Sequence, residues 1–451
     1  MDLEKVERLS ALAEEQRALL WEAEETIWSH PETGYKEWKT HAYMKKVLEG
    51  LGYSLKEAGN IPGFYADLDT GRPGPTLVLM AELDSVLCMS HPQADPSTGA
   101  AHACGHHAQC AALLGAAAAL KTPGALDGLC GRIRLMGVPA EELLELEYRE
   151  GLRKQGIIKY YGGKLEFLHR GYFDDADLCV MLHTGGGKGS FSLSPGQNGC
   201  LNKQIAYQGL AAHAGGAPHQ GINALYAANL GLSAINALRE TFRDEDHIRV
   251  HPIVTGQAGA VNVIPDLVTL ESYVRGASLD AIREANRRVN RALAGAAAAM
   301  GARVHITDRP GYSPVYNDPN MYDLTRRVMC RLVGEDKVLV DRSWGTGCTD
   351  MGDISCVFPA IHPSGSGAEG RGHGDDYRIV DKESALTLAA KFLLAMSAAL
   401  LGEGAKEAKH ILDNKRTPYP SIQAYLKAVD ELSADLDAVE YLQDGVRLHL
   451  S

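Results

Sequence analysis

Four short motifs in this chain carry side chains that could bind a divalent metal ion. They are His-Ala-Cys-Gly-His-His at 102–107, Pro-Ala-Glu-Glu at 139–142, Leu-His-Thr at 182–184 and Gly-His-Gly-Asp-Asp at 372–376. The candidate ligands are one thiol, three imidazoles and one carboxylate: Cys104, His106, His183, His373 and Glu142. This is more than one four-coordinate ion needs, so the set favours two metal ions that share a ligand. Glu141 stands beside the set as a carboxylate able to accept a proton from water, so the pattern predicts a metallohydrolase.

The Cys104-Gly105-His106 segment is suited to a loop, because residues two apart do not share a helix face. Gly105 permits a sharp turn that directs both side chains toward one point. A helix is predicted to start just after it, and its N-terminal dipole would favour the thiolate form of Cys104. A motif this short is equally compatible with a buried cysteine beside an incidental histidine, and both interpretations stay open.

Glu141 and Glu142 are adjacent acids that follow a predicted strand and a Pro-Ala turn. Neighbouring side chains point in different directions, so one can bind metal while the other takes a proton from water. Taken alone, a solvated acidic pair that opens a helix is the commoner arrangement. His183 and His373 are also open to structural or surface roles when each is taken singly. The prediction of a site depends on all of them meeting at one edge of a sheet.

Composition narrows the class of protein. The 451 residues favour two domains, and 45% hydrophobic with 23% charged residues is ordinary for a soluble globular chain. A net charge of −12 argues against non-specific binding of nucleic acid. The first residues do not resemble a signal peptide, and the alanine-rich runs at 111–119 and 294–300 are too short to span a membrane. Nine cysteines without regular spacing favour reduced thiols in the cytoplasm.

The candidate ligands follow elements that are typical of an α/β sheet. Near-continuous apolar runs at 77–80 and 179–182 predict strands that are covered on both faces. Strands are predicted at 63–69, 76–84, 132–138 and 178–183, and helices at 3–29, 40–50 and 108–120. The ligands lie just past the C-terminal ends of these strands, where open α/β sheets place their sites. The expected fold is a mixed, mostly parallel sheet flanked by helices.

A different pattern occupies residues 200–311. Strands at 201–207, 248–255, 267–275 and 302–308 and helices at 221–239 and 279–299 give the order β-α-β-β-α-β, which is ferredoxin-like. The sequence therefore predicts a discontinuous catalytic domain, residues 1–197 and 312–451, with an inserted lid domain, residues 198–311. Two charged segments of the tail, 422–432 and 436–442, have helical patterns.

The predicted lid carries its own polar residues. His213 follows a strand, Asn262 lies in Val-Asn-Val-Ile-Pro, and Arg275 ends a strand. Each could make only local hydrogen bonds. Arg275 could instead bind a substrate carboxylate through two parallel hydrogen bonds, or it could pair with Glu271.

The order of these motifs resembles the aminoacylase/carboxypeptidase-G metallopeptidase family, in its amidohydrolase branch with a Cys-Gly-His metal motif. That branch includes auxin-conjugate hydrolases, hippurate hydrolases and p-aminobenzoyl-glutamate hydrolases. The resemblance extends over about residues 5–402, and it is carried by residues 81–84, 102–106, 139–142, 213–218, 221–225, 349–353 and 360–363.

The resemblance implies roles for individual residues. Cys104, His106, Glu142, His183 and His373 match the metal ligands, Glu141 the general base and Asp84 an acid beside the metals. His213 matches a histidine that reaches the site of the partner subunit in a homodimer formed through the lid. Asn262 and Arg275 match lid residues near the substrate. The implied cofactors are two divalent ions per subunit, zinc or manganese.

Three departures from the family pattern concern the surroundings of the site. His107 and Gln109 stand where relatives often have Asp and His, and Cys348 replaces the usual Ser before Thr-Asp. The charged segment 143–161 is longer than the glycine-rich link of relatives and leaves the site directly. We therefore expect this segment to change the shape of the substrate pocket, and so the choice of substrate, more than the reaction itself.

The sequence thus predicts an amidohydrolase that cleaves the amide bond between an acyl or aroyl group and an amino acid. A dipeptidase or an arylamine deaminase using the same residues remains an alternative, separable by whether ammonia or an amino acid is released. A non-catalytic partner subunit is the second alternative, against which the complete set of candidate ligands argues.

Overall fold

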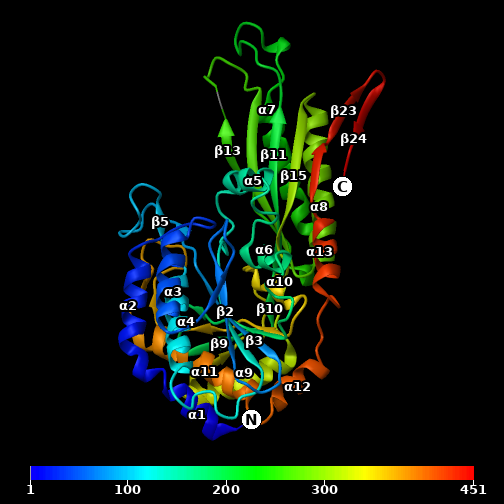
Figure 1. The fold of residues 1–451 in the computed structure, drawn as a ribbon. Helices are drawn as coiled ribbons and strands as arrows, with labels where there is room; N and C mark the ends of the chain where they lie inside the picture. The colour runs from blue at the N-terminus through cyan, green and yellow to red at the C-terminus, as the bar shows by residue number, and fades with distance from the viewer. Residues whose placement is uncertain (1, 258, 451) are drawn as a thin grey trace. The chain divides into compact units, whose positions relative to one another are not determined.

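The computed structural model describes residues 2–257 and 259–450 (Figure 1). The chain divides into two compact units. Unit 1 comprises Met1–Gly196, Val315–Trp344 and Thr349–Ile422, and unit 2 comprises Gln197–Pro314, Gly345–Cys348 and Gln423–Ser451.

Unit 1 is built on a six-stranded sheet in the order β1-β2-β6-β3-β7-β18. The strands are β1 (Leu55–Glu57), β2 (Phe64–Asp69), β6 (Arg132–Val138), β3 (Thr76–Glu82), β7 (Leu178–Val180) and β18 (Ala360–Ile361). The last four run parallel, and β1 and β2 are antiparallel to their neighbours. Every residue of β3 is buried, as its continuous apolar run predicts. The predicted mixed, mostly parallel sheet is confirmed.

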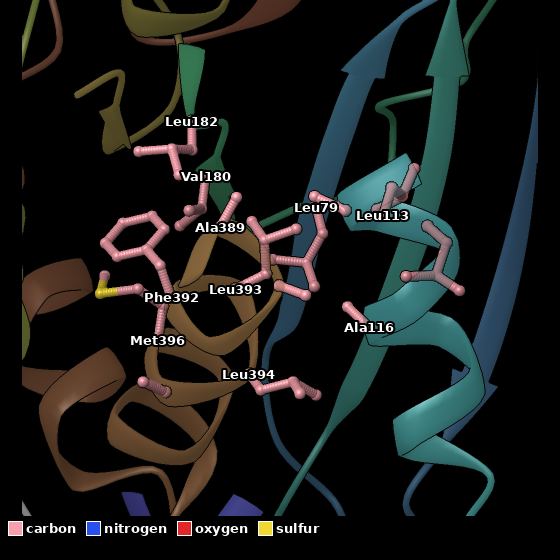
Figure 2. Close-up of a cluster of buried hydrophobic side chains, with 14 of the residues drawn as sticks. Leu79, Leu113, Ala116, Val180, Leu182, Ala389, Phe392, Leu393, Leu394 and Met396 are labelled. Carbon is pink, nitrogen blue, oxygen red and sulfur yellow. The ribbon is translucent and has the colours of Figure 1, made fainter. Parts of the chain in front are cut away.

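Helices surround this sheet: α1 (Leu3–Ala11), α2 (Arg17–Trp28), α3 (Trp38–Gly50), α4 (His106–Leu120), α5 (Leu146–Lys154), α6 (Gly163–His169), α9 (Pro319–Val333), α10 (Met351–Ser355), α11 (Leu388–Leu401) and α12 (Lys406–Asp413). The helix predicted over 3–29 is interrupted by a 3-10 turn at Glu14–Gln16. α4 is buried along its whole length and contacts both β3 and α11. Figure 2 shows Leu113 of α4, Leu79 of β3 and Leu393 of α11 meeting in the core.

One helical stretch among the described residues, Glu383–Leu401, is long and apolar enough to cross a membrane. Most of it, 83%, is buried inside the structure. Its apolar surface is therefore accounted for by packing in the core of unit 1, as Phe392, Leu393 and Leu394 show in Figure 2.

A second, four-stranded sheet of unit 1 has the order β17-β9-β19-β8. It consists of β17 (Val338–Val340), β9 (Phe191–Leu193), β19 (Ser364–Gly365) and β8 (His183–Thr184). Ser364 pairs with His183 in parallel register. This pairing fixes the backbone of His183, one of the candidate ligands.

Unit 2 is an antiparallel sheet in the order β12-β14-β11-β15-β22, with β13 also paired to β14. The strands are β12 (Arg249–Val250), β13 (Ile253–Gln257), β14 (Leu267–Gly276), β11 (Gly199–Gln208), β15 (Arg303–Tyr312) and β22 (Ala434–Asp437). Helices α7 (Ala224–Leu238) and α8 (Leu279–Ala299) pack together and contact β11 and β14. Along β14 every second residue is buried, which leaves Thr269, Glu271, Tyr273 and Arg275 on the partly exposed face. The observed order of elements follows the predicted β-α-β-β-α-β, except that the strand predicted at 248–255 is divided into β12 and β13.

The C-terminal tail differs from the sequence prediction, which placed residues 312–451 together and gave 436–442 a helical pattern. α13 (Ile422–Asp430) forms as predicted, but β22 pairs with β15, and β23 (Val439–Leu442) and β24 (Gly445–Leu448) form a hairpin. Gln423–Ser451 therefore clusters with unit 2. The physical reason is the alternation of Ala434-Asp435-Leu436-Asp437, whose period of two suits a strand. The acids of that strand pair with Arg309 and His305 of β15.

Candidate metal centre

The Cys-Gly-His segment forms the predicted turn at the start of α4. Gly105 precedes the helix with a φ of 98°, in the left-handed region. A Cβ atom there would lie 2.5 Å from the Tyr377 hydroxyl and 2.6 Å from the Thr184 carbonyl oxygen, so only glycine fits. The turn brings Cys104 Sγ within 3.5 Å of His183 Nε2.

The five predicted ligands are brought together in overlapping groups whose ligand atoms lie within 4.8 Å of one another: Cys104 with His106 and His183, Cys104 with Glu142 and His373, and His106 with Glu141 and Glu142. Cys104 belongs to two of these groups, one with two imidazoles and one with an imidazole and a carboxylate. His106 Nε2 is buried, makes no hydrogen bond and lies 3.2 Å from Glu82 Oε2. A soft thiolate shared between nitrogen and oxygen ligands suits two transition-metal ions, so the donor set fits the predicted pair.

His373 is the most exposed member of the set. Its side chain is 54% exposed, and its backbone adopts a left-handed φ of 62° between two glycines. Its Nε2 lies 3.0 Å from Glu142 Oε1, and its backbone N–H donates to Ala103. This loop therefore presents an imidazole from the solvent side, while the other ligands come from buried elements.

Asp84 connects two of the candidate ligands. One carboxylate oxygen lies 3.1 Å from His106 Nδ1, and the other accepts the backbone N–H of Glu142 at 2.8 Å. The contact at Nδ1 orients the imidazole so that Nε2 points away from Asp84, which is how carboxylates orient metal-binding histidines. Asp84 is completely buried, as expected for a residue that positions ligands.

The loop before Glu141 has a strained backbone. Ala140 has a φ of 59°, which is uncommon for a residue other than glycine. Its N–H donates to Glu37 Oε1 at 2.7 Å, and its carbonyl oxygen accepts the N–H of Gly163 at 3.2 Å. These two hydrogen bonds stabilise the unusual backbone conformation of Ala140, after which Glu141 and Glu142 point in different directions.

Arg149 is a further support of this loop that the sequence did not single out. It lies on α5, within segment 143–161, and is 1% exposed. Its guanidinium donates to the carbonyl oxygens of Tyr161 at 2.6 Å and Ala140 at 3.4 Å, and also to that of Glu142. The charged segment thus contributes an internal contact to the metal centre rather than a solvated surface.

A cluster of buried charged side chains lies next to Glu141. The Lys164 ammonium lies 2.6 Å from Glu82 and 2.5 Å from Asp350, and all three side chains are at most 1% exposed. Glu82 also accepts a hydrogen bond from Gln109 at 2.9 Å, one of the residues that depart from the family pattern. Glu82, Glu141 and Asp350 form another group of potential ligand atoms, where Lys164 already supplies a cation. Neither Lys164 nor Arg149 had a recognisable spacing in the sequence.

Burial and neighbouring charges move the pKa of three groups in the site, Glu141, Glu142 and His183. Burial, followed by the charges of Glu82 and Glu142, raises the pKa of Glu141 well above its ordinary value. Burial raises the pKa of Glu142, but the hydrogen bond from His373 together with the charges of His373 and His106 outweighs it and leaves that pKa lowered. Burial, with a smaller effect of His106, lowers the pKa of His183 to about 4, which keeps this imidazole neutral and able to bind metal.

Cys104 departs from the expectation of a thiolate stabilised by the helix dipole. Burial first, and then the Glu142 carboxylate, raise the pKa of the Cys104 thiol. Desolvation in this closed turn outweighs the dipole of α4. The thiol must therefore lose its proton as a cation binds, as thiolate ligands do.

His362 is a histidine that the sequence left unassigned. Its ring lies 6.0 Å from that of His183, and its Nε2 is buried without a hydrogen-bond partner. Burial lowers its pKa to about 3, so it is neutral. It lies beside the ligand groups without being a member of one.

The predicted site residues of unit 2 fall into two places on its sheet. His213 is bridged to Val263, and Ala214 donates to the Asn262 carbonyl, so His213 and Asn262 are neighbours. Both follow the end of the sheet where Gln208 pairs with Leu267. Arg275 pairs with Cys200 at the opposite end of β14. The eight residue steps between Leu267 and Arg275 span about 27 Å, so one unit does not bring these residues to one small ligand.

The His213 ring is held in a defined tautomer. Its Nδ1 accepts the backbone N–H groups of Gly215 at 3.2 Å and Gly216 at 2.9 Å. A neutral imidazole with an accepting Nδ1 carries its proton on Nε2. The exposed His213 side chain therefore presents an N–H donor outward.

The model of peptidase family M20/M25/M40 matches residues 64–399. The human Xaa-Arg dipeptidase is 28% identical over 378 residues, which cover 80% of this chain and 77% of that protein. A p-aminobenzoyl-glutamate hydrolase subunit from Escherichia coli is also 28% identical, over 60% of this chain and 53% of that protein. A dinuclear metal-binding peptidase of family M20 from Bacillus subtilis has the same fold, with a TM-score of 0.65, 19% identity and coverage of 86% of this chain and 99% of that one.

Proposed function

The chain belongs to peptidase family M20/M25/M40, and from that premise we propose a dinuclear metal-dependent amidohydrolase that cleaves N-acyl or aroyl amino acids. The observation that supports this most is the sharing of Cys104 between two groups of potential ligands. One group would hold an ion with His106 and His183, and the other with Glu142 and His373. Zinc and manganese both suit this mixture of sulfur, nitrogen and oxygen donors. Divalent ions bound there would lower the pKa of a water molecule toward about 7 and polarise the amide carbonyl.

Glu141 is the proposed general base. It is adjacent to a ligand, is 7% exposed, and makes no ion pair with Lys164, which is occupied by Glu82 and Asp350. Its carboxylate oxygen lies within 4.8 Å of ligand atoms of His106 and Glu142, close enough to take a proton from water bound there. Glu141 would take a proton from the attacking water and return it to the nitrogen of the leaving amine.

His213 is proposed to act in the site of a second subunit. The separation of about 27 Å along β14 places it far from Arg275 of the same unit. Its outward Nε2–H is suited to donate a hydrogen bond to the negative oxygen that develops on the carbonyl. Asn262, which lies beside it, would reach the same substrate, and Arg275 is the proposed partner of the substrate carboxylate.

The dimer that this requires would form through unit 2. β13 is an edge strand, and its Ile253 and Val254 are 51% and 49% exposed. On α7, Tyr226 and Leu230 are likewise exposed and lie one helical turn apart. The other edge strand of the sheet is β22, whose acids Asp435 and Asp437 already pair with Arg309 and His305, so β13 and α7 are the proposed pairing surface.

A dipeptidase using the same residues is the second candidate, because the human relative bears that name and matches four-fifths of this chain. Two Escherichia coli relatives are named as separate subunits of one hydrolase, which keeps a hetero-oligomeric partner as another candidate. A panel of N-acyl amino acids, dipeptides and arylamines, each tested with zinc and with manganese, separates the reactions. Release of an amino acid from N-acyl substrates supports the proposal, release of ammonia supports a deaminase, and a metal-loaded chain inactive on the whole panel contradicts it.

A further inference from the structure

Two cysteines of unit 2 lie next to each other in a place that the proposed hydrolysis does not use. Cys200 is near the start of β11, and Cys348 ends the short segment Gly345–Cys348. Both cysteines are reduced in the structure. Cys348 is also one of the departures from the family pattern, since it replaces the usual Ser before Thr-Asp. The pair is therefore a feature of this chain that needs an explanation of its own.

The backbone brings this segment alongside the start of β11. Gln197 forms a parallel bridge with Gly345, and the N–H of Asn198 donates to the Gly345 carbonyl oxygen at 3.0 Å. Three residue steps from the bridged pair lead to Cys200 on one stretch and to Cys348 on the other. Because the two stretches run in the same direction, the two cysteines occupy matching positions.

A hydrogen bond joins the two thiols. This bond, followed by burial, raises the pKa of the Cys200 thiol well above its ordinary value. A hydrogen bond raises the pKa of the group that donates it, so Cys200 is the donor and the Cys348 sulfur is the acceptor. A disulfide bond requires the two sulfur atoms to approach to about 2 Å. Residues 346–348 belong to no helix or strand, so their backbone can make this small movement without breaking the sheet.

The two thiols differ in how easily a reagent reaches them. Cys200 is 3% exposed, and its Sγ lies so close to Gly311 that a Cβ atom added there would be 2.7 Å away. Cys348 is partly exposed. Oxidants react first with thiols that are accessible and able to ionise. An oxidant therefore meets Cys348 first, and the buried Cys200 is the thiol placed to complete a disulfide.

We propose that Cys348 and Cys200 form a reversible oxidation site at which hydrogen peroxide produces a disulfide bond. The Cys348 sulfur attacks one peroxide oxygen, the O–O bond breaks, and a sulfenic acid and one water molecule form. The Cys200 sulfur then displaces the hydroxyl group from Cys348, and this group leaves as a second water molecule with the Cys200 proton. The two thiols lose two electrons and two protons, and the peroxide gains both. A dithiol reverses the reaction by thiol–disulfide exchange.

The disulfide would hold the segment Gly345–Cys348 against β11. In the reduced protein, the contacts of this segment include a long hydrogen bond, at 3.5 Å, from Arg275 to the Thr346 carbonyl oxygen. A covalent link at Cys348 adds a constraint that such a bond does not provide. Backbone N–H groups of residues 346–348 should therefore exchange with deuterium at least about threefold more slowly after oxidation. Neither the oxidation nor its test depends on the proposed hydrolase activity.

The test treats the zinc-loaded protein with hydrogen peroxide, blocks the remaining thiols with N-ethylmaleimide and maps linked peptides by mass spectrometry. Wild-type protein should give a peptide pair that joins residues 200 and 348 and that separates when dithiothreitol is added. Cys348→Ser, which places the usual Ser at this position, and Cys200→Ser should each abolish the link. Cys330→Ser removes another partly exposed cysteine, in α9 of unit 1, and should leave the link unchanged.

Two results would overturn the proposal. One is that Cys200 and Cys348 both remain fully blocked by N-ethylmaleimide after peroxide treatment. The other is oxidation of Cys348 to its sulfinic acid while Cys200 stays reduced, because the neighbouring thiol then does not capture the sulfenic acid. Cys348 is partly exposed, so Cys348→Ser decides the question if the buried Cys200→Ser does not fold. Equal exchange of residues 346–348 in the linked and reduced forms would contradict the constraint on the segment.

Discussion

The predicted site residues of unit 1 are held by contacts within their own unit, whereas those of unit 2 are more exposed and have fewer such contacts. In unit 1, Cys104, Glu142 and His183 are linked by short contacts, and the loop that carries Glu142 is held by Arg149 and Asp84. In unit 2, His213 and Asn262 are exposed, and the guanidinium of Arg275 lacks a described carboxylate partner. The comparison indicates that unit 1 holds its site residues in place by its own contacts. Unit 2 instead exposes polar side chains whose binding partners would come from a substrate or a second subunit.

The largest expected effect concerns the chemistry of unit 1. Glu141→Gln removes the proton carrier and keeps the side-chain volume, so kcat should fall by about 10²–10⁴. The metal content, measured by elemental analysis, should stay at the wild-type value because Glu142 is unchanged. Wild-type kcat in this variant would show that the proton is carried by another group.

The next effect tests whether unit 2 is completed by a second subunit. His213→Ala should lower kcat by about 10²–10³, the usual cost of one donor to a developing oxyanion. Refolding it together with Glu141→Gln should restore about a quarter of the wild-type activity, because half of the dimers would then hold one intact site. Mixed dimers verified by mass spectrometry that remain inactive would contradict action across the interface.

A smaller effect concerns recognition of the substrate carboxylate by Arg275. Hydrolysis of an N-acyl amino acid should exceed that of its α-amide by roughly 10- to 100-fold in kcat/KM. Arg275→Ala should remove most of this difference and alter the rate for the amide less. If both compounds are hydrolysed at equal rates, and the rates stay equal in Arg275→Ala, then Arg275 does not recognise the substrate carboxylate. That result would favour a deaminase.

The smallest effect tests how firmly unit 1 supports its own loop. Arg149→Met leaves the buried Tyr161 carbonyl without its donor, which should cost about 1–3 kcal/mol of unfolding free energy and also reduce kcat. Arg153→Met on the same helix removes a partly exposed ion pair with Glu150 and should cost less than about 1 kcal/mol. Thermal unfolding of the metal-loaded variants measures both. Equal shifts in the two variants would mean that Arg149 does not support the loop.

The sequence predicted most of what depends on local patterning. Period-two and continuous apolar runs gave β2, β3, β6 and β7 of unit 1 and β11, β14 and β15 of unit 2, but not the edge strands β1, β18 and β22. The four motifs gave the five potential ligands that lie together. It did not reveal Arg149 or Lys164, because each acts through backbone or carboxylate groups far away in the sequence. It misassigned 436–442, because a strand at a sheet edge is specified by its partner β15 as much as by its own residues.

The pKa of Cys104 shows a second limit of sequence reasoning. The helix dipole could be inferred from the position before α4, but the burial that raises the pKa of the thiol comes from packing against distant residues such as Tyr377 and Ala368. These residues are more than 200 positions from Cys104 in the chain. Desolvation is a property of the assembled site, so its sign could not be read from the motif.

The central claim, two ions that share Cys104, is tested most directly by the metal content of purified protein reconstituted with zinc or manganese and then dialysed. We predict about two ions per chain for the wild type, fewer for Cys104→Ser, and loss of N-acyl amino acid hydrolysis on chelation that is reversed when the ions are returned. Wild-type protein that retains activity after complete removal of its metal, or that binds none after reconstitution, would contradict the account.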